Sequence, residues 1–130
     1  MDLTLRHPRP EDLAAAGAVV VAEDLAFAGE VVLGEQFIAQ AWERPALDLD
    51  RDAWVIEGTD GAIIAVAHVE DEESGVTDSF TCVHPDHAAL EVRTALWDAA
   101  EARARERHAD HPRPRIRHAS NATDEEEGAG

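Results

Sequence analysis

A short segment beyond the middle of the chain has the residue types and the order of an anion-binding site. Residues 76–83 (Val-Thr-Asp-Ser-Phe-Thr-Cys-Val) are predicted to form a strand, His-Pro-Asp-His at residues 84–87 forms a turn, and a long helix is expected from about Thr94 to Arg107. The first backbone N–H groups of a helix have no partner within it, and the positive end of the helix dipole lies behind them. A loop at residues 88–93 that opens such a helix therefore suits a phosphate group.

The same segment contains groups that could bind a metal or act as a nucleophile. His84 and His87 have the His-x-x-His spacing, His108 and His111 repeat it, and Cys82 lies two residues before the first histidine. A tetrahedral zinc site needs four converging ligands, and the sequence does not place such a set. Ordinary turn histidines and a small core cysteine explain these residues more simply, so we predict no metal site and no cysteine nucleophile.

Two acidic stretches have a chemical as well as a structural interpretation. Residues 70–73 (Glu-Asp-Glu-Glu) could hold a general base, although a solvated turn accounts for the same residues. Asp48, Asp50 and Asp52 have the odd spacing of a calcium loop, but the glycine at its sixth position and the glutamate at its twelfth are both missing. The sequence therefore leaves the catalytic acid and base unknown.

The elements that must position these groups follow from hydrophobic periodicity and from turn signals. Asp-Gly at residues 60–61 predicts a tight turn, which makes the strands on either side of it antiparallel neighbours. The expected order predicts an α+β fold, an α/β three-layer arrangement with a largely antiparallel sheet. Strands are expected at residues 3–6, 53–57, 62–69, 76–83 and 115–119, and helices at residues 10–28, 34–42 and 94–107.

Composition restricts the classes of partner. The chain has 130 residues, a net charge of −17 and no lysine, which argues against nucleic acid and anionic membranes because such affinity comes mainly from basic side chains. No apolar run is long enough to span a membrane, no secretory leader is visible at the N-terminus, and a single cysteine excludes an internal disulfide. We therefore expect a cytoplasmic protein with one domain at residues 1–119 and an acidic, disordered tail at residues 120–130.

Several stretches resemble the GNAT acetyltransferase family. Family members often read Val-His-Pro-Asp-His-Arg-Gly-x-Gly-Ile-Gly-Thr-Ala-Leu where residues 83–96 read Val-His-Pro-Asp-His-Ala-Ala-Leu-Glu-Val-Arg-Thr-Ala-Leu. Residues 5–13, 47–55 and 99–105 also resemble family usage, closest to the bacterial tandem and mycothiol-synthase-like branch. The resemblance covers roughly residues 3–119, and it implies a GNAT-like, mostly antiparallel mixed sheet flanked by helices and incomplete at its C-terminal end.

The resemblance also implies a ligand and a set of residues that would meet it. Acetyl-CoA would be the acyl donor, and a primary amine of a small molecule or peptide would be the acceptor. Cys82 and Val83 would meet the thioester and the pantetheine arm. The pyrophosphate would lie on the segment that follows, which comprises Ala88, Ala89, Leu90, Glu91, Val92, Arg93 and Thr94.

Three positions depart from the family pattern. The motif's Arg or Gln falls on Ala88, its central Gly on Glu91 and its final Gly or Ala on Arg93. A carboxylate at Glu91 would face phosphate charge, a contact that costs on the order of a few kcal/mol near a protein surface. Arg93 could pair with phosphate, but its side chain also crowds the helix start. We therefore predict weak or absent acyl-CoA binding.

The end of the chain also departs from the family pattern. Family members continue into a further helix, whose tyrosine often protonates the leaving thiolate, and into two more strands, whereas this chain contains no tyrosine. We therefore expect the strand at residues 115–119 to be an uncovered sheet edge through which the protein forms a homodimer or binds a partner. The first functional hypothesis is a GNAT-type N-acyltransferase domain. The alternative is a non-catalytic GNAT-like interaction module or a truncated remnant.

Overall fold

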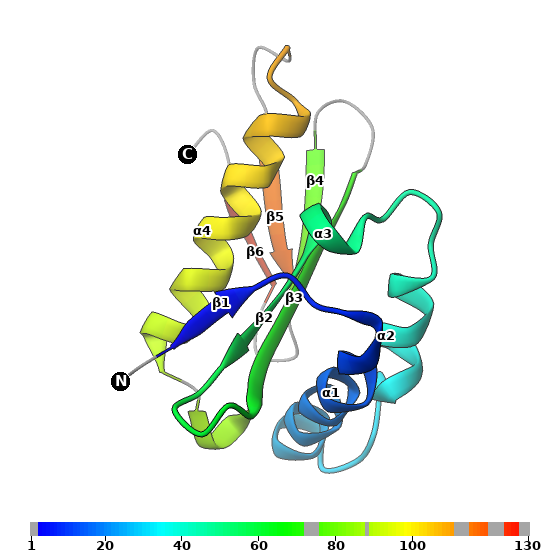
Figure 1. Ribbon diagram of the computed structural model, residues 1–130, viewed down its shortest axis with the longest axis vertical. Helices are drawn as coiled ribbons and strands as arrows, with labels where there is room; N and C mark the ends of the chain where they lie inside the picture. The colour runs from blue at the N-terminus through cyan, green and yellow to red at the C-terminus, as the bar shows by residue number, and fades with distance from the viewer. Residues whose placement is uncertain (1–2, 72–75, 88, 111–114, 120–123, 128–130) are drawn as a thin grey trace.

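The described residues form one mixed sheet with helices on both faces. The computed structural model describes residues 3–71, 76–87, 89–110, 115–119 and 124–127. Their six strands lie in the order of the chain, and each is antiparallel to its neighbours except that β4 and β5 are parallel (Figure 1). The strands are β1 (Thr4–Arg6), β2 (Ala53–Glu57), β3 (Ile63–Asp71), β4 (Val76–Val83), β5 (Arg115–Ala119) and β6 (Asp124–Glu127).

Most helices lie where periodicity predicted them. The helices are α1 (Leu13–Ala28), α2 (Gly34–Trp42), α3 (Leu49–Asp52) and α4 (Leu90–Arg107), with short 3-10 turns η1 (Pro10–Asp12) and η2 (Pro85–His87). Gly29 ends α1 with a φ of 74°, the left-handed conformation that glycine adopts without strain. The main difference is α4, which begins at Leu90 instead of Thr94, so the predicted loop at residues 90–93 is the first turn of the helix. The sequence Leu-Glu-Val-Arg lacks the glycines that would keep this turn open, and each of its residues is compatible with a helix.

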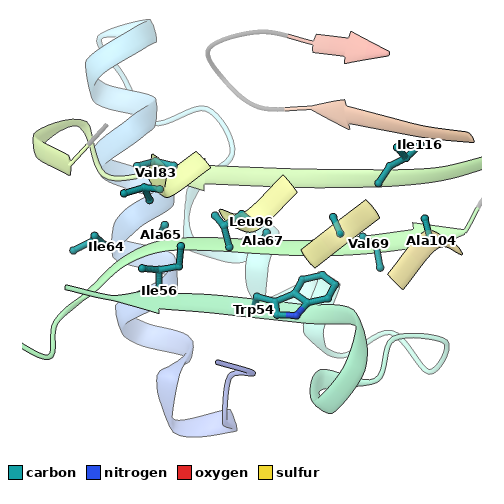
Figure 2. Packing of buried hydrophobic residues seen from close by; sticks show 12 residues of the cluster. Trp54, Ile56, Ile64, Ala65, Ala67, Val69, Val83, Leu96, Ala104 and Ile116 are labelled. Carbon is teal, nitrogen blue, oxygen red and sulfur yellow. The ribbon is translucent and has the colours of Figure 1, made fainter. Parts of the chain in front are cut away.

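Two apolar clusters on opposite faces of the sheet make up the core. Because side chains alternate along a strand, Trp54 and Ile56 point to one face while Val55 points to the other. Helix α4 covers the first face through Val92, Leu96, Ala100 and Ala104 (Figure 2). Helices α1 and α2 cover the second face through Ala16, Val19, Val20, Ile38 and Ala41. The result is the predicted three-layer α+β arrangement.

The acidic segment near the C-terminus differs from the expectation of a disordered tail. Residues 124–127 form β6, which runs antiparallel to β5 with Asp124 opposite Ala119 and Glu127 opposite Ile116. A short edge strand needs only the backbone groups of its neighbour, so the scarcity of apolar residues in this segment does not prevent pairing. Among the described residues β6 therefore covers the edge expected at β5 and becomes the last strand of the sheet. The homodimer or partner at the sheet edge stays a prediction.

Membrane insertion of the described helices is not supported. Among the residues that the structure describes, no helix is both long enough and apolar enough to cross a bilayer.

Candidate functional site at the end of strand β4

The last residues of β4 extend beyond the described pairing with β5. That pairing runs from Val76 opposite Arg115 to Phe80 opposite Ala119. On its other side β4 remains paired with β3 up to Val83, and the next N–H, that of His84, donates to the Ile64 carbonyl at 2.8 Å. The backbone of residues 81–83 is thus fixed on the β3 side while lying past the described end of β5.

The N-terminus of α4 follows this strand end after η2. Ala89 precedes the helix with an extended backbone, and its carbonyl accepts the N–H groups of Val92 at 3.1 Å and Arg93 at 3.4 Å. None of the described side chains caps this helix. The first turn is open to solvent at Leu90, which is 77% exposed, but it already contains the carboxylate of Glu91. The dipole favours an anion here, and Glu91 is an anion that the chain itself supplies.

The predicted ligand-binding residues differ in how far their side chains are exposed to solvent. Cys82, Val83 and Val92 are buried, and Ala89 and Arg93 are partly buried. The side chains of Leu90, Glu91 and Thr94 are exposed, and Ala88 lies outside the described residues. The exposed positions lie at the open start of α4, in its first turn or just after it.

Glu23 links Val83 and Arg93, a role that sequence patterns did not predict. It lies on α1, its side chain is fully buried, and its Oε2 accepts the backbone N–H of Val83 at 2.8 Å. The same oxygen lies 3.7 Å from Nη2 of Arg93 on α4. Side chains from helices on opposite faces of the sheet therefore meet at the end of β4, and the N–H of Val83 is already in use.

The thiol of Cys82 lies beside this carboxylate. It is buried, and its Sγ lies 3.8 Å from the carbonyl oxygen of Val19 on α1. Burial raises the pKa of the Cys82 thiol, and the charge and hydrogen bond of Glu23 raise it further. A buried thiol that stays protonated is a poor nucleophile, which agrees with the interpretation of Cys82 as a core residue.

The described residues of the acidic run, which lie at the end of β3, are held in ion pairs. Glu70 pairs with Arg44 and lies 3.2 Å from Nε2 of His68, while Asp71 lies 2.7 Å from Nη2 of Arg107. Glu72 and Glu73 lie outside the described residues. Burial, assisted by the charge of Arg44, lowers the pKa of His68 to about 4. The described part of this run thus stabilises the fold.

A serine, a histidine and a glutamate form a chain of contacts on the α4 side of the sheet. Nδ1 of His118 lies 3.0 Å from Oγ of Ser79, and its Nε2 lies 3.2 Å from Oε2 of Glu101. The order is that of a nucleophile, a base and an acid, but Ser79 is only 1% exposed and His118 only 2%. The ring of Trp97 stacks on that of His118, with the ring centroids 4.8 Å apart, and covers it further from solvent. This group ties β4, β5 and α4 together and offers no access to a substrate.

The histidines of the turn do not gather further ligands. The rings of His84 and His87 lie 5.7 Å apart, and His111 lies outside the described residues. In the part of the chain that the structure describes, no group of three or more His, Cys, Asp or Glu side chains could hold a metal ion.

The fold is shared with solved acetyltransferases. A GCN5-related N-acetyltransferase from Sphaerobacter thermophilus matches 89% of this chain with a TM-score of 0.78 and 24% identity. A GNAT family acetyltransferase from Brucella melitensis, solved in complex with acetyl-CoA, matches 88% with a TM-score of 0.66 and 18% identity. The putative acetyltransferase yncA from Salmonella typhimurium, solved with its cofactor acetyl-CoA, matches 88% with a TM-score of 0.64 and 18% identity.

These similarities define the fold of the chain. It has the α+β mixed sheet with flanking helices of the GNAT acetyltransferases. The matched region corresponds to 37% of the Sphaerobacter chain, 75% of the Brucella chain and 69% of the Salmonella chain, so this chain spans about a third of the length of the first. No protein-family model and no curated protein matches the sequence.

Glu23 is the site residue that sequence reasoning missed. It directly follows the apolar run at residues 13–22, a position typical of the polar boundary of a buried stretch. Its helical spacing carries a better signal, because Glu23 lies seven residues after Ala16 and four after Val19, both of them buried. A carboxylate on the buried stripe of a helix requires a partner, and here the partner is the strand that leads into the candidate site.

Proposed function

We propose that this chain is a GNAT-type acyltransferase domain with restricted access for its acyl donor. Acetyl-CoA would be the donor and a primary amine the acceptor. The observation that supports this class of function is the placement of residues 81–83 at the end of β4, where β3 holds the strand and η2 leads directly into the N-terminus of α4. Two solved proteins of the same fold contain acetyl-CoA.

The strand end and the helix start would act on different parts of the donor. A backbone N–H at the end of β4 can polarise a thioester carbonyl, so that an amine held nearby attacks it directly. The open amides of the first turn of α4 suit a phosphate group. Val83 is the last residue of β4, and we assign its N–H to the first task; in the form described here Glu23 accepts that N–H. Donor binding is weak because a ligand must compete with this contact and with the charge of Glu91.

Calorimetric titration with acetyl-CoA tests the proposal. At low and at molar salt, with the oligomeric state recorded by light scattering, we expect a dissociation constant of about 0.1–1 mM, equivalent to roughly 4–6 kcal/mol of binding free energy. Acetyl transfer to a panel of primary amines should be slow but measurable at high donor concentration. A dissociation constant in the low micromolar range would contradict restricted access.

The alternative is a non-catalytic GNAT-like module, and one observation favours it. The Val83 N–H is already hydrogen-bonded to Glu23, and the first turn of α4 carries the carboxylate of Glu91. Groups of the protein itself therefore compete with acetyl-CoA at both the strand end and the helix start. A folded protein that shows neither binding nor transfer at millimolar acetyl-CoA would support this alternative over the acyltransferase.

A further inference from the structure

We propose that Glu23 and Arg93 form a latch that closes the end of β4, and that Glu23 sets the affinity of the site for its acyl donor. The inference rests on the proposed function, because it names the residues that restrict access to the same site. The latch joins α1 on one face of the sheet to α4 on the other, across the last residue of β4.

The first argument concerns the single N–H of Val83. Its bond to Glu23 Oε2 is 2.8 Å long, which is a short, charge-assisted hydrogen bond. A ligand carbonyl would have to accept the same N–H, and one N–H cannot serve both acceptors at full strength. A donor that binds at Val83 must therefore displace a fully buried carboxylate.

The second argument concerns the way in which Arg93 is held. Its Nη2 is 3.7 Å from Glu23, longer than a direct hydrogen bond, and its side chain is 17% exposed. Its Nη1 is buried and has no hydrogen-bond partner among the described residues. A buried guanidinium nitrogen without a partner is costly, and Arg93 lies in the first turn of α4, where phosphate is favoured. Arg93 can therefore exchange a long contact with Glu23 for bidentate hydrogen bonds to a phosphate.

The third argument concerns charge. With the latch closed, the negative charge of Glu23 lies beside the Val83 N–H, the group assigned to the donor's carbonyl under the proposed function, and that of Glu91 lies in the first turn of the helix. Both carboxylates oppose an anionic ligand, but only Glu23 also occupies a backbone donor. Removal of Glu23 therefore frees a donor as well as lowering the negative charge, whereas removal of an exposed carboxylate only lowers the charge.

The test compares Glu23→Ala with a matched control. Glu30→Ala removes an exposed carboxylate from the segment that follows α1 and changes the net charge by the same amount. In titrations with acetyl-CoA at one salt concentration, we expect Glu23→Ala to bind at least about tenfold more tightly than the natural protein, while Glu30→Ala stays within about twofold. The amide resonance of Val83 should shift when Glu23 is replaced and again when acetyl-CoA is added.

Two further variants complete the experiment. Glu23→Gln keeps the size of the side chain and replaces the charge by a weaker acceptor, so we expect several-fold tighter binding even where the alanine variant fails to fold. Arg93→Ala in the Glu23→Gln background should abolish that gain, because Arg93 would contact the phosphate in the open form.

The outcomes separate the latch from the proposed function. Weak binding by the natural protein together with weak binding by a folded Glu23→Gln overturns the latch and leaves restricted access standing, with Glu91 as its cause. Low-micromolar binding by the natural protein contradicts both restricted access and the latch. A gain by Glu30→Ala equal to that of the Glu23 variants overturns the latch in favour of a general effect of net charge.

Discussion

The carboxylate of Asp24 accepts the backbone N–H of Gly34 at 2.9 Å, so the middle of one helix holds the start of the next. The same oxygen, Oδ2, also accepts the N–H groups of Val32 at 3.0 Å and Leu33 at 2.9 Å, and Asp24 is fully buried. These N–H groups precede or open α2, where helical partners are missing. Asp24 is therefore the anchor of the α1–α2 connection, which explains a polar residue on the buried stripe of α1.

Replacement of Asp24 tests this anchor. Asp24→Ala leaves three N–H groups without their acceptor and should lower the free energy of unfolding by about 3–5 kcal/mol. Asp24→Asn retains one oxygen acceptor and should cost less, about 1–3 kcal/mol. Urea denaturation followed by circular dichroism measures both changes, with the exposed Glu30→Ala as the control. A loss below about 0.5 kcal/mol for Asp24→Ala would show that water replaces the carboxylate.

Asp52 is the centre of a second buried charge cluster, between α3 and α4. Its side chain is 2% exposed, and it lies 2.8 Å from Nε of Arg103 and 3.1 Å from Nη1 of Arg107. Burial alone would raise the pKa of the Asp52 carboxyl, but the backbone N–H of Asp48 and the two guanidinium groups outweigh it, so the pKa lies below its ordinary value. The ionised form is therefore the one that stabilises the fold.

The lowered pKa of Asp52 decides how the stability of the fold changes with pH. Because the pKa is lower in the folded state, Asp52 contributes its full stability above about pH 4 and loses it as the pH falls through the folded pKa. Asp52→Asn should lower the free energy of unfolding by about 2–3 kcal/mol at neutral pH and by less below pH 4. Denaturation midpoints over this range measure the difference, and parallel curves for the two proteins would contradict the prediction.

His68 also favours its deprotonated form in the folded state, which for a histidine is the neutral one. Its ring lies between Phe37 and Phe80, with centroids 5.8 and 5.6 Å away, and it is 2% exposed. Its pKa of about 4 lies below the ordinary value near 6.5, so the unfolded chain binds the proton more readily. The fold should therefore lose stability as the pH falls from about 6.5 to about 4, by roughly 3 kcal/mol in total. The groups that face the ring are Glu70, at 3.2 Å, and Arg44, which pairs with Glu70.

The variant His68→Phe isolates this contribution. Phenylalanine fits the aromatic surroundings and removes Nδ1 of His68, which is buried without a hydrogen-bond partner among the described residues. We expect a flatter stability curve between about pH 6.5 and 4, with no loss at neutral pH. His87→Gln removes an exposed histidine and is the control, whose curve should follow that of the natural protein. An unchanged slope in His68→Phe would refute the assignment.

The fold could be predicted largely because its signals are local. Short apolar runs bounded by turn residues marked β2, β3 and β4, and the Asp-Gly turn predicted the antiparallel pairing of β2 with β3. The start of α4 could not be placed, because the family loop was expected at a sequence that lacks the family's glycines. Strand β6 was missed because an edge strand depends on its neighbour's backbone more than on its own side chains.

The candidate site was predictable only in part. The residues around Val83 were predicted from the order of strand, turn and helix, which is a local pattern, and their role stays a prediction. Glu23 was missed because its contact with Val83 joins residues 60 positions apart, and nothing in the local sequence of α1 specifies that partner. Arg93 was expected to face a phosphate or crowd the helix start, and the structure shows a third outcome, a contact with Glu23. Local sequence patterns thus do not predict which polar residues pair when they lie far apart in the chain.

The last prediction concerns Cys82, which reports on the closed state of the strand end. Because its thiol is buried and its pKa is raised, a thiol reagent such as dithionitrobenzoate should react with the native protein at least about 100-fold more slowly than with the denatured chain. Glu23→Gln removes a negative charge that raises this pKa, so it should increase the native rate, and Glu30→Ala should not. Equal rates for the native and denatured protein would show that the end of β4 opens readily, which would contradict both the burial of Cys82 and a stable latch.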